Sequence, residues 1–241
     1  MAIEGRNILI TGAAVRVGRA MALAVADAGC NVVIHYYRSE DEAKKTRDDV
    51  RARGVECYLI QGNLADPDDV AGFVDNALNF GPLFALVNSA SLFQNYYLDD
   101  TTLKIWEMHM AVNLRAPFLL CQAFARASGN EPGGRIVNIL DWRALRPGAD
   151  HFAYTISKAG LVAMTRSLAV ALAPNITVNG IAFGAILPPS DGGDTEDILE
   201  SVPAKRWADL DEVGETLLFL LKGPTYITGE IIHLAGGRQL I

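Results

Sequence analysis

The chain has 241 residues, of which 50% are hydrophobic and 20% are charged. This length and composition suit one globular domain with a sizeable core, and they exclude a disordered or fibrous protein. The formal net charge of −7 argues against a broad surface for nucleic acid or an anionic membrane, so a small molecule is the expected partner.

The cysteines and the N-terminal residues indicate the compartment. Cys30, Cys57 and Cys121 are widely separated and lack metal-ligand spacing, which predicts core thiols in a reducing, cytoplasmic compartment and no metal site. The sequence does not open with a charged lead and a long apolar run, and no later stretch has about 20 uninterrupted apolar residues. We therefore expect neither a targeting segment nor a membrane span.

Seven short apolar runs alternate with amphipathic segments along the chain. They cover residues 7–11, 31–36, 56–61, 84–89, 135–140, 176–182 and 230–235. Such runs indicate strands buried on both faces, as in a parallel sheet that helices cover on each side. The alternation predicts an α/β protein, with an open, doubly wound parallel sheet of about seven strands in a single domain, residues 1–241.

Polar residues mark the starts of several predicted helices. Ser39 with Glu42 forms a capping-box pattern, and Asp66 precedes a proline suited to a first helical turn. Asp99 or Asp100 would cap the helical segment that follows over 103–128. These signals place helices between the predicted strands.

One stretch, residues 184–206, is rich in Pro, Gly and Asp and lies between two regular segments. Irregular chain of this length is usually functional or mobile. We interpret it as a lid over a pocket.

The turn between the first strand and the first helix, residues 11–20, has two glycines that frame small residues. Gly12 and Gly18, with the small side chains between them, let the backbone approach a diphosphate, while the helix start offers unpaired N–H groups. Ala14 replaces the middle glycine of the usual G-x-G-x-x-G pattern, so a purely structural turn remains the alternative.

The end of the second strand indicates which nucleotide would bind. An acid there would bind the ribose hydroxyls of NAD, but residues 35–42 place no acid at the strand end. Arg38 and Ser39, with His35 and Arg16 nearby, suit the 2′-phosphate of NADP(H). The alternative is that Arg38 is a solvated surface cation.

Residues that end the third and fourth strands also fall at the ligand-binding edge of an open sheet. These are Asn63 and Leu64 after the third strand, and Asn88, Ser89 and Ala90 after the fourth. We expect them to contact the cofactor, and ordinary strand-to-helix capping is the alternative.

A tyrosine and a lysine four residues apart suggest proton chemistry. A helix that begins near Phe152 puts Tyr154 and Lys158 on one face, with Cβ atoms about 5–6 Å apart, so that they can interact directly. A free phenol has a pKa of about 10, and a nearby ammonium group would lower it by favouring phenolate. The same spacing is also common on exposed helices, so the pair alone does not establish catalysis.

The glycine-framed turn, "NSAS", "AVNLRAPF", "YTISK" and "ITVNGIAFG", in this order, resemble the short-chain dehydrogenase/reductase family over essentially the whole chain. The resemblance implies a Rossmann-type fold, a homotetramer or dimer, and hydride transfer from the cofactor. It also implies that Tyr154 is the proton donor, that Lys158 lowers its pKa and binds the nicotinamide ribose, and that Asn113 supports a proton-relay water.

Asp141 stands 13 residues before the tyrosine, where most members of this family carry serine. A carboxyl group there resembles the pteridine reductase branch, which includes bacterial dihydromonapterin and dihydrofolate reductases. That likeness implies that Phe93 stacks on a pterin against the nicotinamide and that Arg16 reaches cofactor and substrate. A protonated Asp141 beside Tyr154 could relay a proton to a ring nitrogen, and the alternative is a strand-end residue bonded to backbone.

Together these interpretations define a predicted site and three hypotheses. The predicted cofactor residues are Gly12, Arg16, Val17, Gly18, His35, Tyr37, Arg38, Ser39, Asn63, Leu64, Asn88, Ser89, Ala90, Lys158, Gly184 and Ile186, the substrate residues are Arg16, Phe93, Asp141 and Tyr154, and the catalytic residues are Asn113, Asp141, Tyr154 and Lys158. The first hypothesis is an NADPH-dependent reductase of a pterin or related nitrogen heterocycle. The alternatives are a carbonyl reductase acting on a 3-oxoacyl group or ketone, and a catalytically silent NADP-binding regulatory protein.

Overall fold

The computed structural model describes residues 2–129, 133–188 and 196–241. Seven parallel strands form one sheet in the order β3-β2-β1-β4-β5-β6-β7. The strands are β1 (Asn7–Thr11), β2 (Asn31–Tyr36), β3 (Cys57–Gln61), β4 (Leu83–Asn88), β5 (Gly134–Asp141), β6 (Ile176–Phe183) and β7 (Ile231–Leu234). The predicted doubly wound α/β fold in a single domain is confirmed.

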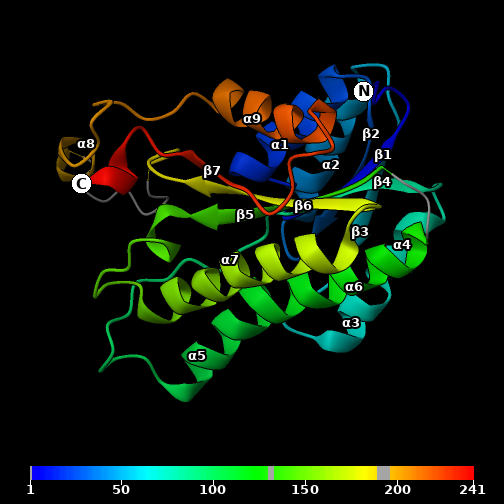
Figure 1. Ribbon diagram of the computed structural model, residues 1–241. Helices are drawn as coiled ribbons and strands as arrows, with labels where there is room; N and C mark the ends of the chain where they lie inside the picture. The colour runs from blue at the N-terminus through cyan, green and yellow to red at the C-terminus, as the bar shows by residue number, and fades with distance from the viewer. Residues whose placement is uncertain (1, 130–132, 189–195) are drawn as a thin grey trace.

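Helices cover both faces of the sheet. They are α1 (Arg16–Asp27), α2 (Glu40–Arg51), α3 (Pro67–Ala71), α4 (Phe73–Leu78), α5 (Leu103–Met110), the π-helix η1 (Ala111–Arg115), α6 (Ala116–Ser128), the 3-10 helix η2 (Trp142–Ala144), α7 (Phe152–Leu172), α8 (Glu196–Glu200), α9 (Leu210–Lys222) and the 3-10 helix η3 (Arg238–Leu240). Figure 1 shows α1, α2 and α9 on one side of the sheet, and α3, α5, α6 and α7 on the other.

The apolar strands are explained by burial on two sides. Ile8 and Ile10 of β1 belong to one core cluster with Met21 of α1, whereas Leu9 belongs to the opposite cluster with Phe124 of α6. Successive strand residues point to opposite faces, so a strand that is covered on both faces is buried at successive positions and is mostly apolar.

Helix α7 is long and apolar enough, by length and composition alone, to cross a membrane. It packs against β5 and β6, and nine of its residues are buried, among them the charged Lys158. This is the arrangement of a core helix that covers a sheet.

The predicted helix starts are confirmed only in part. Asp66 caps α3 by accepting a hydrogen bond from the backbone N–H two residues on. The capping box predicted at Ser39 is wrong, because its side chain makes no capping bond. Thr102 caps α5, so the prediction of Asp99 or Asp100 at this position is also wrong.

The helical segment predicted over 103–128 is divided into three parts. The π-helix η1 separates α5 from α6 and carries Asn113. π-helical turns occur mostly as short interruptions of α-helices and often at functional sites. The interruption therefore falls at a residue that the sequence singles out for function.

The strand order reverses between β1 and β4, which are neighbours in the sheet although β2 and β3 lie between them in sequence. In open α/β sheets, ligands bind at the carboxyl ends of the strands at such a reversal. The loops after β1 to β6 leave the sheet at its carboxyl ends, and the predicted site residues lie in the last residues of these strands, in the loops or on the helices that follow.

Candidate functional site

The turn after β1 is packed closely against the end of β4. Gly12 has φ +66°, and a Cβ atom there would lie 2.9 Å from the Cα atom of Ala90, while a Cβ atom at Gly18 would overlap the carbonyl of Gly12. The hydroxyl of Thr11 accepts hydrogen bonds from the backbone N–H groups of Ser89 and Ala90, at 2.9 and 3.0 Å. The result is a backbone-walled turn at a helix start, which fits the diphosphate of a dinucleotide.

Arg16, at the first position of α1, has an unusual backbone conformation. Its φ of +53° lies in the left-handed region, at a cost of about 1–2 kcal/mol for a residue with a side chain. The comparison with G-x-G-x-x-G singled out Ala14 as the residue that replaces a glycine. In the structure, the non-glycine residue of this turn with a positive φ is Arg16 and not Ala14. The Arg16 guanidinium donates to the carbonyl of Pro188 at 3.0 Å, which joins the first turn to the segment after β6.

His35 is a scaffold residue of this turn. It is 2% exposed, its Nδ1 accepts from the N–H of Gly12 at 3.3 Å, and its Nε2 lies 3.1 Å from the carbonyl of Gly62. Burial lowers the pKa of His35 to about 4, so the ring is neutral at physiological pH. The prediction that His35 helps to bind a phosphate is therefore wrong.

The exposed end of β2 presents the other predicted phosphate ligands. The guanidinium of Arg38 lies 4.8 Å from the ring centre of Tyr37 and donates to its hydroxyl at 3.3 Å. Ser39 follows directly before α2, where its hydroxyl makes no capping bond. A cation and hydroxyl groups thus lie together at a helix start.

The side chain of Asn88 points into the core. It is 2% exposed and donates to Asn138 at 2.8 Å, and Asn138 in turn donates to Thr165 at 2.9 Å. The prediction that Asn88 contacts the cofactor is therefore wrong for its side chain, which joins β4 to β5 and α7.

The remaining predicted cofactor residues lie at or just beneath the carboxyl edge of the sheet. Asn63 uses its side-chain oxygen to accept from Ala65 at 3.0 Å within its own turn. Leu64 and Ile186 are buried, and Val17 is partly buried against the core. For these apolar residues the side chain serves packing, which leaves their backbone as the group that could face a ligand.

Gly184 directly follows β6, and its backbone pairs with the end of β7. Its N–H donates to the carbonyl of Leu234 at 2.9 Å, and a Cβ atom at this position would lie 2.6 Å from the Cα atom of Ala235. The close approach of β6 and β7 therefore requires glycine here.

Tyr154 and Lys158 lie one turn apart on α7, as the spacing predicted. The Lys158 ammonium is buried and donates to the carbonyl of Ile139 at 2.7 Å, and it lies 5.9 Å from the centre of the Tyr154 ring. Burial lowers the pKa of Lys158 to about 8. The expected direct contact between ammonium and phenol is thus replaced by a contact with the end of β5.

Asp141 ends β5 and faces both the backbone and the phenol. One carboxylate oxygen accepts from the N–H of Arg143 at 2.8 Å, and the other accepts from the hydroxyl of Tyr154 at 3.0 Å. The sequence left two interpretations of Asp141 open: a strand-end residue bonded to the backbone, and a partner of Tyr154. Both contacts are present, and each uses a different carboxylate oxygen.

This environment determines the protonation of the phenol. Burial, and then the charge and hydrogen bond of Asp141, raise the pKa of Tyr154 well above its ordinary value, while the Arg143 guanidinium opposes the rise. The lowering expected from Lys158 is wrong for this state of the protein. Tyr154 is a neutral hydroxyl group, which is the form that can donate a proton.

Asn113 joins three parts of the site. Its side-chain oxygen accepts from the N–H of Leu92 at 2.8 Å and from Ser91 at 3.2 Å, and its amide donates to the carbonyl of Leu92 and to the hydroxyl of Ser157, both at 3.0 Å. This fully buried amide has no remaining hydrogen-bonding capacity. Any bond to a relay water has to come from the main chain of Asn113.

Phe93 lies at the entrance to this group. The residue is 55% exposed, and its ring stacks on His151 with centroids 4.2 Å apart and meets Tyr154 edge-on at 4.8 Å. His151, directly before α7, has a left-handed backbone with φ +50°. An exposed aromatic face therefore lies beside the phenol.

Arg143 is a residue of this group that sequence reasoning missed. Its guanidinium lies 3.9 Å from Asp141 and donates to Asp150 at 3.2 Å, and it lies 5.8 Å from the ring centre of Phe93. The sequence does place Arg143 only two residues after Asp141, in the short turn that follows β5. A residue in such a turn stays close to the strand end, and this proximity could have identified Arg143 as a neighbour of the site.

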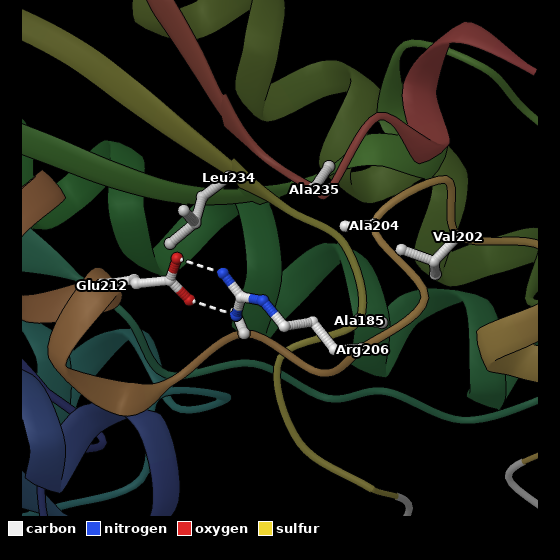
Figure 2. A pocket seen from close by; sticks show the side chains of 9 residues that line it. Ala185, Val202, Ala204, Arg206, Glu212, Leu234 and Ala235 are labelled. Atoms are coloured by element: carbon white, nitrogen blue, oxygen red, sulfur yellow. Dashed lines mark hydrogen bonds and ion pairs between the residues drawn. The ribbon is translucent and has the colours of Figure 1, made fainter.

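The segment proposed as a lid is anchored on its C-terminal side, and residues 189–195 lie outside the described part of the chain. Ala204 donates its N–H to the carbonyl of Gly236, and Arg206 forms a two-pronged ion pair with Glu212, with both contacts at 2.7 Å (Figure 2). These residues enclose a cavity of about 50 Å³ with Ala185 and Val202. It has room for water but not for a substrate.

Comparisons with known proteins identify the family. The family model described as Enoyl-(Acyl carrier protein) reductase matches residues 12–239. The 3-oxoacyl-[acyl-carrier-protein] reductase FabG of Staphylococcus epidermidis is 30% identical over 98% of this chain and 99% of its own length, and the 3-oxoacyl-[acyl-carrier-protein] reductase of Synechocystis is 31% identical over 99% of each. Among solved structures, FolM alternative dihydrofolate reductase 1 from Brucella canis, complexed with NADP, is 36% identical with a TM-score of 0.92, over 100% of this chain and 97% of its own. The chain belongs to the short-chain dehydrogenase/reductase family and is an NAD(P)-dependent oxidoreductase.

Proposed function

We propose that this protein is an NADPH-dependent reductase of a pterin or related nitrogen heterocycle, of the dihydropteridine or dihydrofolate type. The observation that carries the proposal is the 3.0 Å hydrogen bond from the Tyr154 hydroxyl to the Asp141 carboxyl group. A neutral serine-like donor would suffice beside a carbonyl substrate, whereas a carboxyl group can both accept and donate a proton.

Reduction of a ring C=N bond adds a hydride at carbon and a proton at nitrogen. When bound, NADPH supplies the hydride. Tyr154, kept neutral by burial and by Asp141, holds the proton next to the substrate, and its loss to the ring nitrogen leaves a charge that the Arg143 guanidinium stabilises. The Asp141 carboxylate can then take up a proton from solvent and pass it to the phenolate through the same hydrogen bond.

The preference for NADPH over NADH is assigned to the end of β2. Arg38 provides the cation and Tyr37 and Ser39 provide hydroxyl groups, which suit a 2′-phosphate. Gly12 and Gly18 form the turn for the diphosphate, and Lys158 would bind the nicotinamide ribose.

The FolM structures from Brucella, at 36% identity and described as alternative dihydrofolate reductase 1 with NADP, support the heterocycle proposal. The second candidate is a carbonyl reductase acting on a 3-oxoacyl group, which the names of the Staphylococcus and Synechocystis relatives favour. A carbonyl oxygen needs only one proton donor, and Tyr154 provides it.

The test measures NADPH oxidation with dihydrobiopterin, dihydromonapterin, dihydrofolate and an acetoacetyl thioester. We expect turnover of at least one pterin, a loss of about 10²–10⁴-fold in its kcat for Asp141→Asn, and residual carbonyl activity at most. Rapid reduction of the thioester with all three pterins inert would establish the carbonyl reductase instead. NADPH binding without any turnover, unaffected by Tyr154→Phe, would favour the silent regulatory protein.

Four further assignments belong to this proposal: a lid, the oligomeric state, the compartment and the class of partner. The segment 184–206 acts as a lid, which the bond from Arg16 to Pro188 supports on its N-terminal side and the Arg206–Glu212 pair on its C-terminal side. The enzyme acts as a homotetramer or dimer in the cytoplasm, without nucleic-acid or membrane partners. Light scattering on the purified protein, with and without NADPH, tests the oligomeric state.

A further inference from the structure

An alternating series of aromatic and guanidinium groups runs along the rim of the site. The guanidinium of Arg143 lies 5.8 Å from the ring centre of Phe93 and 5.0 Å from that of Trp142, and the guanidinium of Arg238 lies 4.7 Å from the same indole ring. The groups come from the loop after β4, from η2 and from η3, and η3 and α8 lie beyond the carboxyl end of β5 in Figure 1.

The two arginines differ in their partners. Arg143 is paired with Asp150 at 3.2 Å and lies 3.9 Å from Asp141, and its side chain is only 15% exposed. Arg238 is half-buried, and within the described part of the chain it makes no side-chain hydrogen bond and no ion pair. Among the described residues, the ring of Trp142 is the group over which its guanidinium lies.

The position of Arg238 is electrostatically unfavourable unless a ligand neutralises it. Burial, and then the charge of Arg143, lower the pKa of Arg238, and Asp141 and Asp150 offset this only in part. A half-buried cation without a bonded counter-ion loses hydration and gains no charge-assisted hydrogen bond in return. An anion placed against Arg238 would supply that bond.

The geometry favours a carboxylate on a flat substrate. The Arg238 guanidinium, which lies 4.7 Å from the centre of the Trp142 ring, is a planar fork of N–H donors that matches the two oxygens of a carboxylate. Phe93 and Trp142 offer aromatic surface between the reaction centre and this fork, so a planar tail could lie along the rim. A neutral tail would gain the aromatic contacts but not the charge-assisted bonds.

We propose that Arg238, held on Trp142 beside Arg143, binds a carboxylate on the tail of the heterocyclic substrate and so selects substrates with an anionic tail. This inference rests on the proposed pterin reductase function. It assigns to the C-terminal η3 turn a role in substrate choice that is separate from the proton chemistry of Asp141 and Tyr154.

The test compares dihydrofolate, whose tail carries carboxylates, with dihydrobiopterin, whose tail is uncharged. Arg238→Gln is expected to raise KM for dihydrofolate by about tenfold with kcat unchanged, and to leave both constants for dihydrobiopterin within about twofold. Arg238→Lys should restore part of the loss, because it keeps the charge but not the fork. Added salt should weaken dihydrofolate binding in the wild type more than in Arg238→Gln.

Arg166→Gln on the exposed surface of α7 serves as the control for net charge, and thermal midpoints confirm that each variant is folded. If Arg238→Gln changes both substrates equally, or neither, the carboxylate assignment is overturned while the pterin function stands. If the wild type reduces neither pterin, the proposed function and this inference both fail.

Discussion

Replacing Lys158 by methionine should raise the free energy of unfolding at neutral pH, because the wild type has to bury a charged ammonium group when it folds. The ammonium is fully buried, and its pKa falls from 10.5 to about 8 on folding. This difference corresponds to about 3.4 kcal/mol against the folded state near pH 7, because the unfolded chain holds the proton more tightly. Methionine has a similar length and no charge, but it loses the bond to Ile139, worth about 1 kcal/mol.

The pH dependence separates these two effects. Between about pH 8 and 10.5 the folded wild type binds fewer protons than the unfolded chain, so its stability rises with pH, and the variant lacks this rise. We expect Lys158→Met to be about 2 kcal/mol more stable than the wild type near pH 7, and close to equal to it near pH 9.5.

Urea denaturation without cofactor at both pH values measures the difference, and the exposed Lys104→Met serves as the control. The variant should also lose oxidoreductase activity. A variant that is destabilised by the same amount at both pH values would refute the reasoning, because the loss of the hydrogen bond alone would then explain it.

Three other changes test the site. Gly12→Ala should raise the Kd for NADPH by more than about tenfold in a fluorescence titration, because the turn has φ +66° and no room for a Cβ atom beside Ala90; unchanged affinity would show that the turn does not contact the diphosphate. As pH falls from 6.5 to 4, the free energy of unfolding of the wild type should decrease by up to about 3 kcal/mol more than that of His35→Gln, because the buried ring has a pKa of about 4 and protonates more readily in the unfolded chain. Parallel curves of unfolding free energy against pH for the two proteins would contradict this. Asn113→Ala should lower the free energy of unfolding by about 3 kcal/mol and reduce kcat, because it leaves the buried partners at Leu92 and Ser157 unpaired; a loss of stability with full activity would limit Asn113 to the scaffold.

The strands could be predicted from sequence because each is covered on both faces. The run predicted over 176–182 is observed as β6 (Ile176–Phe183), buried at every position. The caps could not be predicted in the same way, since Ser39 and Thr102 are both good capping residues and only the path of the chain decides which hydroxyl meets an N–H group.

The site was predictable where it depends on local spacing and not where it depends on burial. The i, i+4 relation of Tyr154 and Lys158 follows from helix geometry, but their proton affinities depend on Asp141 and on the end of β5. Arg143 and Arg238 meet at one indole ring although they lie far apart in sequence, and no local pattern connects them.

The π-helix between α5 and α6 also constrains how this chain can change in length. A π turn holds one residue more than the α-helical turn it replaces, so deleting a residue between Ala111 and Arg115 would restore regular winding and rotate Asn113 about the axis by roughly a quarter of a turn. The amide would then point away from Leu92 and Ser157. A homologous sequence that aligns with a one-residue gap at this position should therefore be regarded as having lost the connection between the loop after β4 and helix α7, even if its tyrosine and lysine are retained.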